Sequence, residues 1–130
     1  MTEATPQRGK PRRVSELRDV HDFLDEVRLR PGMWVRRSSV IHLDSMLTGF
    51  SVALEIHADA HDWEFGSGGG PFAVWLQKRL GMEYLSALGW AVEVERAAEQ
   101  ADRPAMELFF ELLDEYRAER TGQGPANQAR

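Results

Sequence analysis

The chain contains no cysteine among its 130 residues. Disulfide bonds, thiolate zinc sites and cysteine nucleophiles are therefore excluded, and the absence fits a reducing compartment. Long apolar runs are missing as well, since no stretch approaches the roughly 18–20 residues that span a bilayer. Residues 1–13 also lack the apolar segment of a signal peptide. We therefore expect a cytoplasmic protein without a membrane-spanning segment.

The composition is that of an ordinary globular domain, with 42% hydrophobic and 28% charged residues. A chain of this length fits one domain, because a domain typically takes about 100–200 residues. Both ends are rich in polar residues, proline and glycine, with little to bury. We expect a disordered basic tail over residues 1–13, a single helical domain over residues 14–120, and a second disordered tail over residues 121–130.

Charge is distributed unevenly along the chain. Residues 1–37 contain nine Lys and Arg and six Asp and Glu, a net charge of +3. Residues 38–130 contain seven Lys and Arg and fifteen Asp and Glu, a net charge of −8. An acidic body repels phosphate backbones and attracts cationic partners. We therefore expect no nucleic-acid binding except through the basic N-terminal tail, where a steep salt dependence would reveal it.

Apolar residues recur at three- and four-residue steps, which is typical of amphipathic helices. The first repeat predicts a helix over residues 16–29. Ser15 is the expected cap of this helix. Its expected end lies before Pro31, because the residue preceding a proline is pushed out of the α region.

The second predicted helix begins at Ser38 or Ser39 and carries a wide apolar stripe as far as Ile56. Gly49 lies inside this helix, where glycine costs about 1 kcal/mol relative to alanine. A tight crossing with a neighbouring helix is the compensation that we expect, since glycine lets two backbones approach closely.

Three further helices complete the predicted fold. The third lies between the glycine-rich connector at residues 66–70 and Gly81, which should stop it. The fourth covers residues 85–100, although the alternation within residues 90–96 leaves a short strand open. The last helix is expected to start after Asp102 as its cap. The fold class is therefore all-α, a compact orthogonal bundle of four to five helices with the final helix packed centrally.

Several stretches share the pattern of one protein group. Residues 23–34, 39–50, 89–90 and 108–116 resemble a group of small uncharacterised bacterial proteins. Those proteins have an R-x-R-P-G-M-aromatic turn and a closing F-F-E-L-L-D-E-aromatic helix, and the resemblance covers about residues 17–120. Similar small acidic proteins are predicted immunity partners of secreted toxins, so the resemblance implies an interaction protein.

A second local match is misleading. Residues 27–33 also look like the V-R-K-R-P-G-M-Y opening of the DNA gyrase B ATPase domain. The helix that should then carry the catalytic Glu and the magnesium-binding Asn contains Glu55 but no following Asn. No D-x-G-x-G adenine-binding segment follows, and the chain is too short for that domain. We expect no ATPase activity.

An acidic stripe on the last predicted helix is the most informative feature. Its members are Glu107, Glu111, Asp114, Glu115 and Glu119. Their spacing places them opposite Phe109 and Phe110, on the outer side of the helix. Like charges at four-residue steps repel each other by about a few tenths of a kcal/mol per pair. Nearby arginines, among them Arg103, Arg117 and Arg120, offset part of this charge.

The stripe has two readings. One is a solvated polar face, and the other is a landing surface for a basic protein partner. Because the stripe reinforces the −8 charge of residues 38–130, the leading hypothesis is a non-enzymatic interaction domain. Such a domain would be an immunity-type antitoxin that binds a cationic partner, for example a toxin.

The alternative hypothesis is a small-ligand or anion-binding regulatory domain that uses an arginine-rich turn. The residues involved are Arg28, Arg30, Arg36 and Arg37, with Trp34 and Trp63 as pocket walls. Guanidinium groups recognise carboxylates and phosphates through paired hydrogen bonds. They also cap the last carbonyls of a helix and pair with the acidic body of the same molecule, and this structural role is favoured over ligand binding.

No catalytic, metal or cofactor site is predicted. His57 and His61 stand four residues apart, but no third ligand is identifiable and the pattern lacks the Glu of H-E-x-x-H. The glycine-rich run at residues 66–70 has no preceding strand and no following Lys-Ser/Thr, so it is no P-loop. Serine catalysis lacks a G-x-S-x-G turn.

Overall fold

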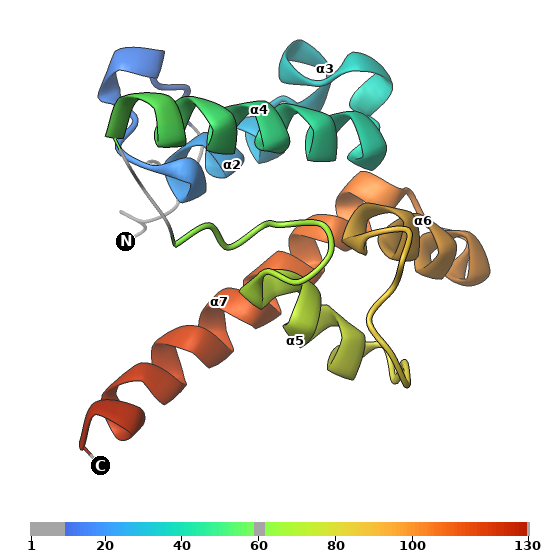
Figure 1. The fold of residues 1–130 in the computed structure, drawn as a ribbon. Coiled ribbons are helices and arrows are strands. Elements are labelled where there is room, and N and C mark those ends of the chain that lie inside the picture. Colours follow the sequence, from blue (N-terminus) through green and yellow to red (C-terminus); the bar gives the residue numbers. More distant parts are fainter. Residues whose placement is uncertain (1–9, 59–61, 130) are drawn as a thin grey trace, which may run out of the picture.

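The computed structural model describes residues 10–58 and 62–129, and the side chains as far as residue 121 (Figure 1). All regular structure within these residues is helical, which confirms the all-α prediction. The elements are η1 (Val14–Glu16), α2 (Val20–Leu29), α3 (Pro31–Trp34), η2 (Arg36–Ser38), α4 (Val40–Ala58), α5 (Pro71–Arg79), α6 (Trp90–Ala101) and α7 (Ala105–Ala129). Residues 90–96 are therefore helical, and no helix of the described part is long and apolar enough to cross a membrane.

The first predicted helix begins later than expected. Asp19, rather than Ser15, caps α2, because its carboxylate accepts a hydrogen bond from the backbone N–H of Asp22 at 2.9 Å. Ser15 lies inside the short turn η1, and the chain is extended again at Leu17. The helix ends at Leu29, before Pro31, as the sequence predicts.

The basic N-terminal tail lies partly outside the described residues, which begin at residue 10. Its last part contacts the body of the protein. Arg12 Nε donates to Glu26 Oε2 at 2.8 Å, and the backbone N–H of Arg12 donates to Glu26 Oε1 at 3.0 Å. Burial alone would raise the pKa of Glu26, but the contacts with Arg12 lower it. The predicted tail is therefore attached to α2 at Arg12.

Helix α4 begins as predicted but differs around its glycine. The Ser39 hydroxyl accepts a hydrogen bond from the backbone N–H of His42 at 3.2 Å, so Ser39 is a cap. Gly49 is exposed, and a Cβ built on it would meet no atom within 4 Å. The predicted tight crossing at Gly49 is therefore wrong within the described chain.

Two glycines set the limits of α5 and α6. Gly81 adopts a φ of 72°, and the N–H of Met82 returns to the carbonyl of Gln77 at 2.9 Å, which ends α5 as predicted. Gly89 adopts a φ of 97° directly before Trp90. Because this conformation suits glycine alone, α6 starts there instead of at residue 85.

Asp102 has a different role from the predicted one. It adopts the left-handed conformation, with a φ of 55°, and its N–H donates to the carbonyl of Glu99 at 3.2 Å. Asp102 therefore ends α6 instead of capping the last helix, which starts at Ala105 after Pro104. The last helix, α7, continues to Ala129.

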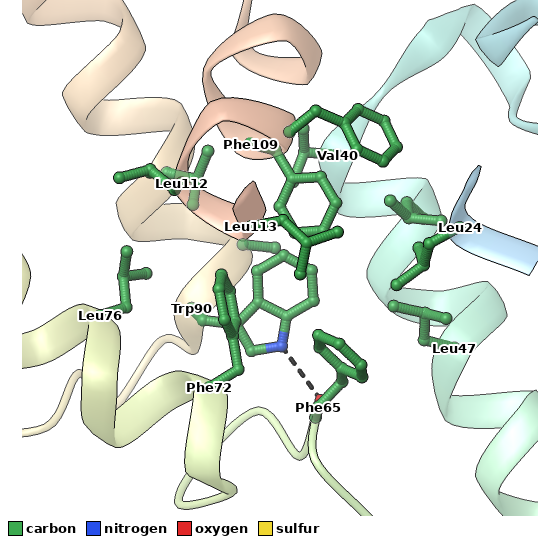
Figure 2. Close-up of a cluster of buried hydrophobic side chains, with 14 of the residues drawn as sticks. Leu24, Val40, Leu47, Phe65, Phe72, Leu76, Trp90, Phe109, Leu112 and Leu113 are labelled. Carbon is green, nitrogen blue, oxygen red and sulfur yellow. Dashed lines mark hydrogen bonds between the residues drawn. The ribbon is translucent and has the colours of Figure 1, made fainter. Parts of the chain in front are cut away.

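The core forms where α7 passes between the other helices. Trp90 stacks on Phe109 with ring centroids 5.2 Å apart and meets the edge of Phe72 at 5.4 Å. Its indole N–H donates to the backbone carbonyl of Phe65 at 3.0 Å, the dashed line in Figure 2. Figure 2 also shows Leu24 of α2 and Leu47 of α4 facing this cluster from the other side. One core thus joins all the longer helices and confirms the compact helical bundle.

Candidate functional site

The acidic residues of α7 lie on its outer side, as predicted. The side chains of Glu107, Glu111, Asp114 and Glu115 are between 42% and 62% exposed, and Glu119 is exposed too. Phe109, on the opposite side of the helix, is buried, and Phe110 is buried between the two sides. We call these five acidic residues the α7 acidic face.

Two of these carboxylates bind arginines from other helices. Arg28 of α2 donates to both oxygens of Asp114, at 2.8 and 2.9 Å. Arg79 of α5 donates to Glu115 Oε1 at 2.6 Å. The hydrogen bonds from the carboxylates raise the pKa of both arginines. No sequence pattern indicates these pairs, because they join distant segments.

A third arginine lies next to the beginning of α7. Arg103 donates to Glu107 Oε1 at 3.1 Å and to Glu111 Oε1 at 2.9 Å, and it also contacts the second oxygen of Glu111. The hydrogen bonds from Arg103 lower the pKa of Glu111. Five carboxylates and three guanidinium groups leave the α7 acidic face with a net charge of −2.

These ion pairs reduce the negative charge of the α7 acidic face but do not neutralise it. Pairs between exposed side chains contribute little to stability, because water screens them and two long side chains lose freedom. A partner can therefore displace an arginine of this kind at a small cost. Glu119 has no ion-pair partner among the described side chains.

A groove lies beside the acidic face and joins it to the end of α2. It has a volume of about 330 Å³ and is lined by Arg28, Pro31, Met106, Glu107, Phe110 and Glu111. Pro31, Met106 and Phe110 are apolar, and the two glutamates belong to the acidic face. The Arg28 guanidinium lies 5.5 Å from the centre of the Phe110 ring, so it covers one end of the groove. We call this feature the α7 groove.

Of the arginine-rich turn, only Arg28 takes part in this site. Arg30, Arg36 and Arg37 are exposed, and none of them forms an ion pair with another described side chain. Arg37 adopts a φ of 58° and Ser38 a φ of 51°, a conformation that is costly for residues with a side chain. The turn thus presents three exposed cationic groups on a strained backbone.

The two tryptophans of the alternative hypothesis do not face each other. Trp34 meets the edge of Phe23 with ring centroids 5.5 Å apart, and Trp63 stacks on Phe50 at 5.7 Å. Phe23 and Phe50 lie 6.1 Å apart between them. Trp34 and Trp63 therefore belong to one row of packed rings, which continues from Trp63 to Phe65 at 5.9 Å, rather than to opposite walls of one pocket.

A polar cluster that no sequence motif indicates surrounds Glu64, in the segment between α4 and α5. Glu64 Oε1 lies 2.5 Å from His21 Nε2, and the Tyr116 hydroxyl donates to Glu64 Oε2 at 2.5 Å. Arg120 contacts the same carboxylate. Burial alone would raise the pKa of Glu64, but these hydrogen bonds together lower it to about 2. Burial and the bond to Glu64 raise the pKa of Tyr116.

Arg117 completes this cluster from α7. Its Nε donates to His21 Nδ1 at 3.0 Å, and its Nη1 donates to Asp25 at 2.9 Å. Because a donor faces Nδ1, the hydrogen of the His21 ring lies on Nε2, which points to Glu64. The carboxylate of Glu64 accepts three hydrogen bonds and is a very weak base, so it is unsuited to proton abstraction. We interpret the Glu64 cluster as a clasp between α2, α7 and the segment that connects α4 to α5.

The remaining candidate sites gain no support. His57 is exposed, and His61 lies outside the described residues. Among the described side chains, no three His, Asp or Glu residues come together as a metal site would require. In the glycine-rich run, a Cβ on Gly70 would lie 2.7 Å from the backbone nitrogen of Gly66. Gly70 is therefore needed for a close turn of the chain itself, whereas a Cβ on Gly68 or Gly69 would meet no atom within 4 Å.

Comparison with known proteins adds nothing to this geometry. No family model, no curated protein and no solved structure matches the chain. The resemblance of the sequence motifs to predicted immunity proteins therefore stays a prediction.

Proposed function

We propose that this protein is a non-enzymatic interaction domain that binds a basic protein partner through the α7 acidic face, as an immunity-type antitoxin would. The observation that carries this proposal is the α7 groove. Its apolar lining, Pro31, Met106 and Phe110, lies directly beside the carboxylates of Glu107 and Glu111. This combination fits an apolar side chain of the partner with a lysine or arginine next to it.

The two parts of the site would make different contributions to binding. An apolar side chain buried in the groove supplies affinity, since a few well-packed central contacts dominate most protein interfaces. The surrounding carboxylates speed up the encounter with a cationic partner and disfavour acidic ones. The face keeps a net charge of −2 beside the groove, and the chain as a whole carries −5.

Arg103 is the feature of the site that a partner has to displace. It is shared between Glu107 and Glu111, at 3.1 and 2.9 Å. A lysine or arginine of the partner can take over one of these carboxylates while Arg103 keeps the other. The internal pairing then serves to hold the face in place before binding and does not block it.

Selection from a displayed library of random peptides tests this proposal and requires no identified partner. We expect the protein to enrich peptides that combine an apolar residue with neighbouring Lys or Arg. The double variant Glu107→Lys with Glu111→Lys should lose these peptides, because it reverses the charge beside the groove.

The matched control is Glu55→Lys with Glu83→Lys, which changes the net charge equally at exposed positions outside α7. This control should retain the enriched peptides. If both double variants bind those peptides equally, the proposal is contradicted, because the position of the changed charges would then have no effect on binding.

A second candidate function is anion binding at the arginine-rich turn. The specific observation in its favour is that Arg30, Arg36 and Arg37 are exposed and unpaired among the described side chains. Titration with inorganic phosphate distinguishes the two functions. Saturable binding that is lost on changing Arg36 and Arg37 to glutamine supports the anion site, and a lack of binding removes it.

A further inference from the structure

Helix α4 has an apolar outer side that no other part of the described chain covers. Met46, Val52 and Ile56 are 37%, 48% and 70% exposed. Gly49 and Ala53, which are exposed as well, lie between them on the same side of the helix at 100° per residue. Surface helices normally place polar residues on the side away from the core. We call these five residues the α4 outer face.

Nothing among the described residues explains why position 49 is a glycine. The glycine weakens the helix, yet a Cβ at this position would meet no atom within 4 Å. The same helix packs its other side into the core through Val40, Leu43 and Leu47. A second helix that crosses closely over the outer face would account for both the glycine and its exposed apolar neighbours.

The absence of charge on the α4 outer face indicates which second helix crosses it. The five residues of the α4 outer face carry no charge, in a chain of net charge −5. A contact between identical molecules places one patch against its own copy, so a patch rich in one charge repels itself and an uncharged patch does not. The α7 acidic face is thus unsuited to self-association. A basic partner, in turn, finds no carboxylate on the α4 outer face.

We propose that the α4 outer face is the contact between two copies of this chain, with the two α4 helices crossing at Gly49. In Figure 1, α4 lies in the upper part of the view, with α5, α6 and α7 below it. One helix face is small compared with the roughly 800 Å² per partner of a standard interface. We therefore expect a weak dimer that forms only at high protein concentration.

Sedimentation velocity of the full chain over a range of concentrations tests this dimer. We expect mostly monomer at about 5 µM and a dimer fraction that increases toward about 500 µM, because a weak dimer forms by mass action. Gly49→Glu and Ile56→Glu should each weaken dimerisation at least about tenfold, because each places like charges at the contact. Both positions are exposed, so these variants keep the fold.

Gln100→Glu on α6 is the control, since it adds the same charge at an exposed position away from α4. It should dimerise like the unchanged chain. A chain that stays monomeric throughout the range overturns the proposal. So does a dimer that Gly49→Glu and Ile56→Glu leave intact. Neither result affects peptide binding by the α7 groove, so the two proposals fail separately.

Discussion

Single residues of the Glu64 cluster illustrate what a sequence cannot show. His21, Glu64 and Tyr116 lie 43 and 52 positions apart along the chain, and no motif links them. Each is an ordinary residue in its own segment, because Glu64 belongs to a connecting segment and His21 to the partly exposed side of α2. Only the tertiary fold, which brings α2, α7 and the segment before α5 together, places them in contact. The apolar core, in contrast, followed from the periodicity of its residues.

Replacing Glu64 by glutamine should destabilise the protein. The amide keeps the shape but loses the negative charge that accepts hydrogen bonds from His21, Tyr116 and Arg120. Because hydrogen bonds to charged groups are worth about 1.5–3 kcal/mol, the free energy of unfolding in urea should fall by a similar amount. Glu83→Gln, at an exposed position, is the control and should change little.

The Glu64 carboxylate should make the free energy of unfolding depend on pH in the acid range. Its pKa in the folded protein is about 2, below the ordinary value of 4.5. Its contribution is therefore complete above about pH 4.5 and is lost as the pH falls toward 2. Glu64→Gln should show a smaller loss of stability across this window than the unchanged chain. An identical pH dependence in both proteins would show that Glu64 is not held as described.

At the scale of helices, the sequence predicted the elements better than their ends. The apolar period located every long helix, but Ser15 and Asp102 were given the wrong roles. Asp19 caps the helix instead of Ser15, because it also has a capping side chain and lies directly before the continuous helix. Asp102 lies between two helices, where it can end one as well as begin the other, and its left-handed backbone ends α6. Capping residues identify a helix boundary more surely than they identify which helix it belongs to.

Two glycine-to-alanine substitutions should have opposite effects on stability. Gly49 is helical and open to solvent, so Gly49→Ala should raise the free energy of unfolding of the dilute monomer by about 0.5–1 kcal/mol. Gly89 has a φ of 97°, and a Cβ there would lie 3.3 Å from Ser67 Cβ, so Gly89→Ala should lower it. Urea unfolding measures both. Destabilisation by Gly49→Ala would mean that α4 is packed more tightly than described.

At the scale of the whole molecule, charge is the property that sequence and structure describe differently. The sequence correctly placed the acidic residues on the outer side of α7, and it anticipated the local pair of Arg103 with Glu107. It also indicated that the arginine turn pairs with the acidic body, but it could not identify Asp114, 86 positions away, as the partner of Arg28, or Glu115, 36 positions away, as the partner of Arg79. Arg117 and Arg120 bind the Glu64 cluster instead of the acidic face. The net charge of the surface therefore depends on the tertiary fold.

The central claim is that carboxylates beside the α7 groove attract a basic partner. The association rate constant of a selected basic peptide, measured at about 50 mM and about 500 mM salt, tests this claim most directly, because salt screens such attraction. For the unchanged chain the rate should fall steeply with salt. Glu107→Lys with Glu111→Lys should lower the rate at low salt at least about tenfold and leave the melting temperature nearly unchanged. An association rate that neither salt nor the double variant alters would contradict the account.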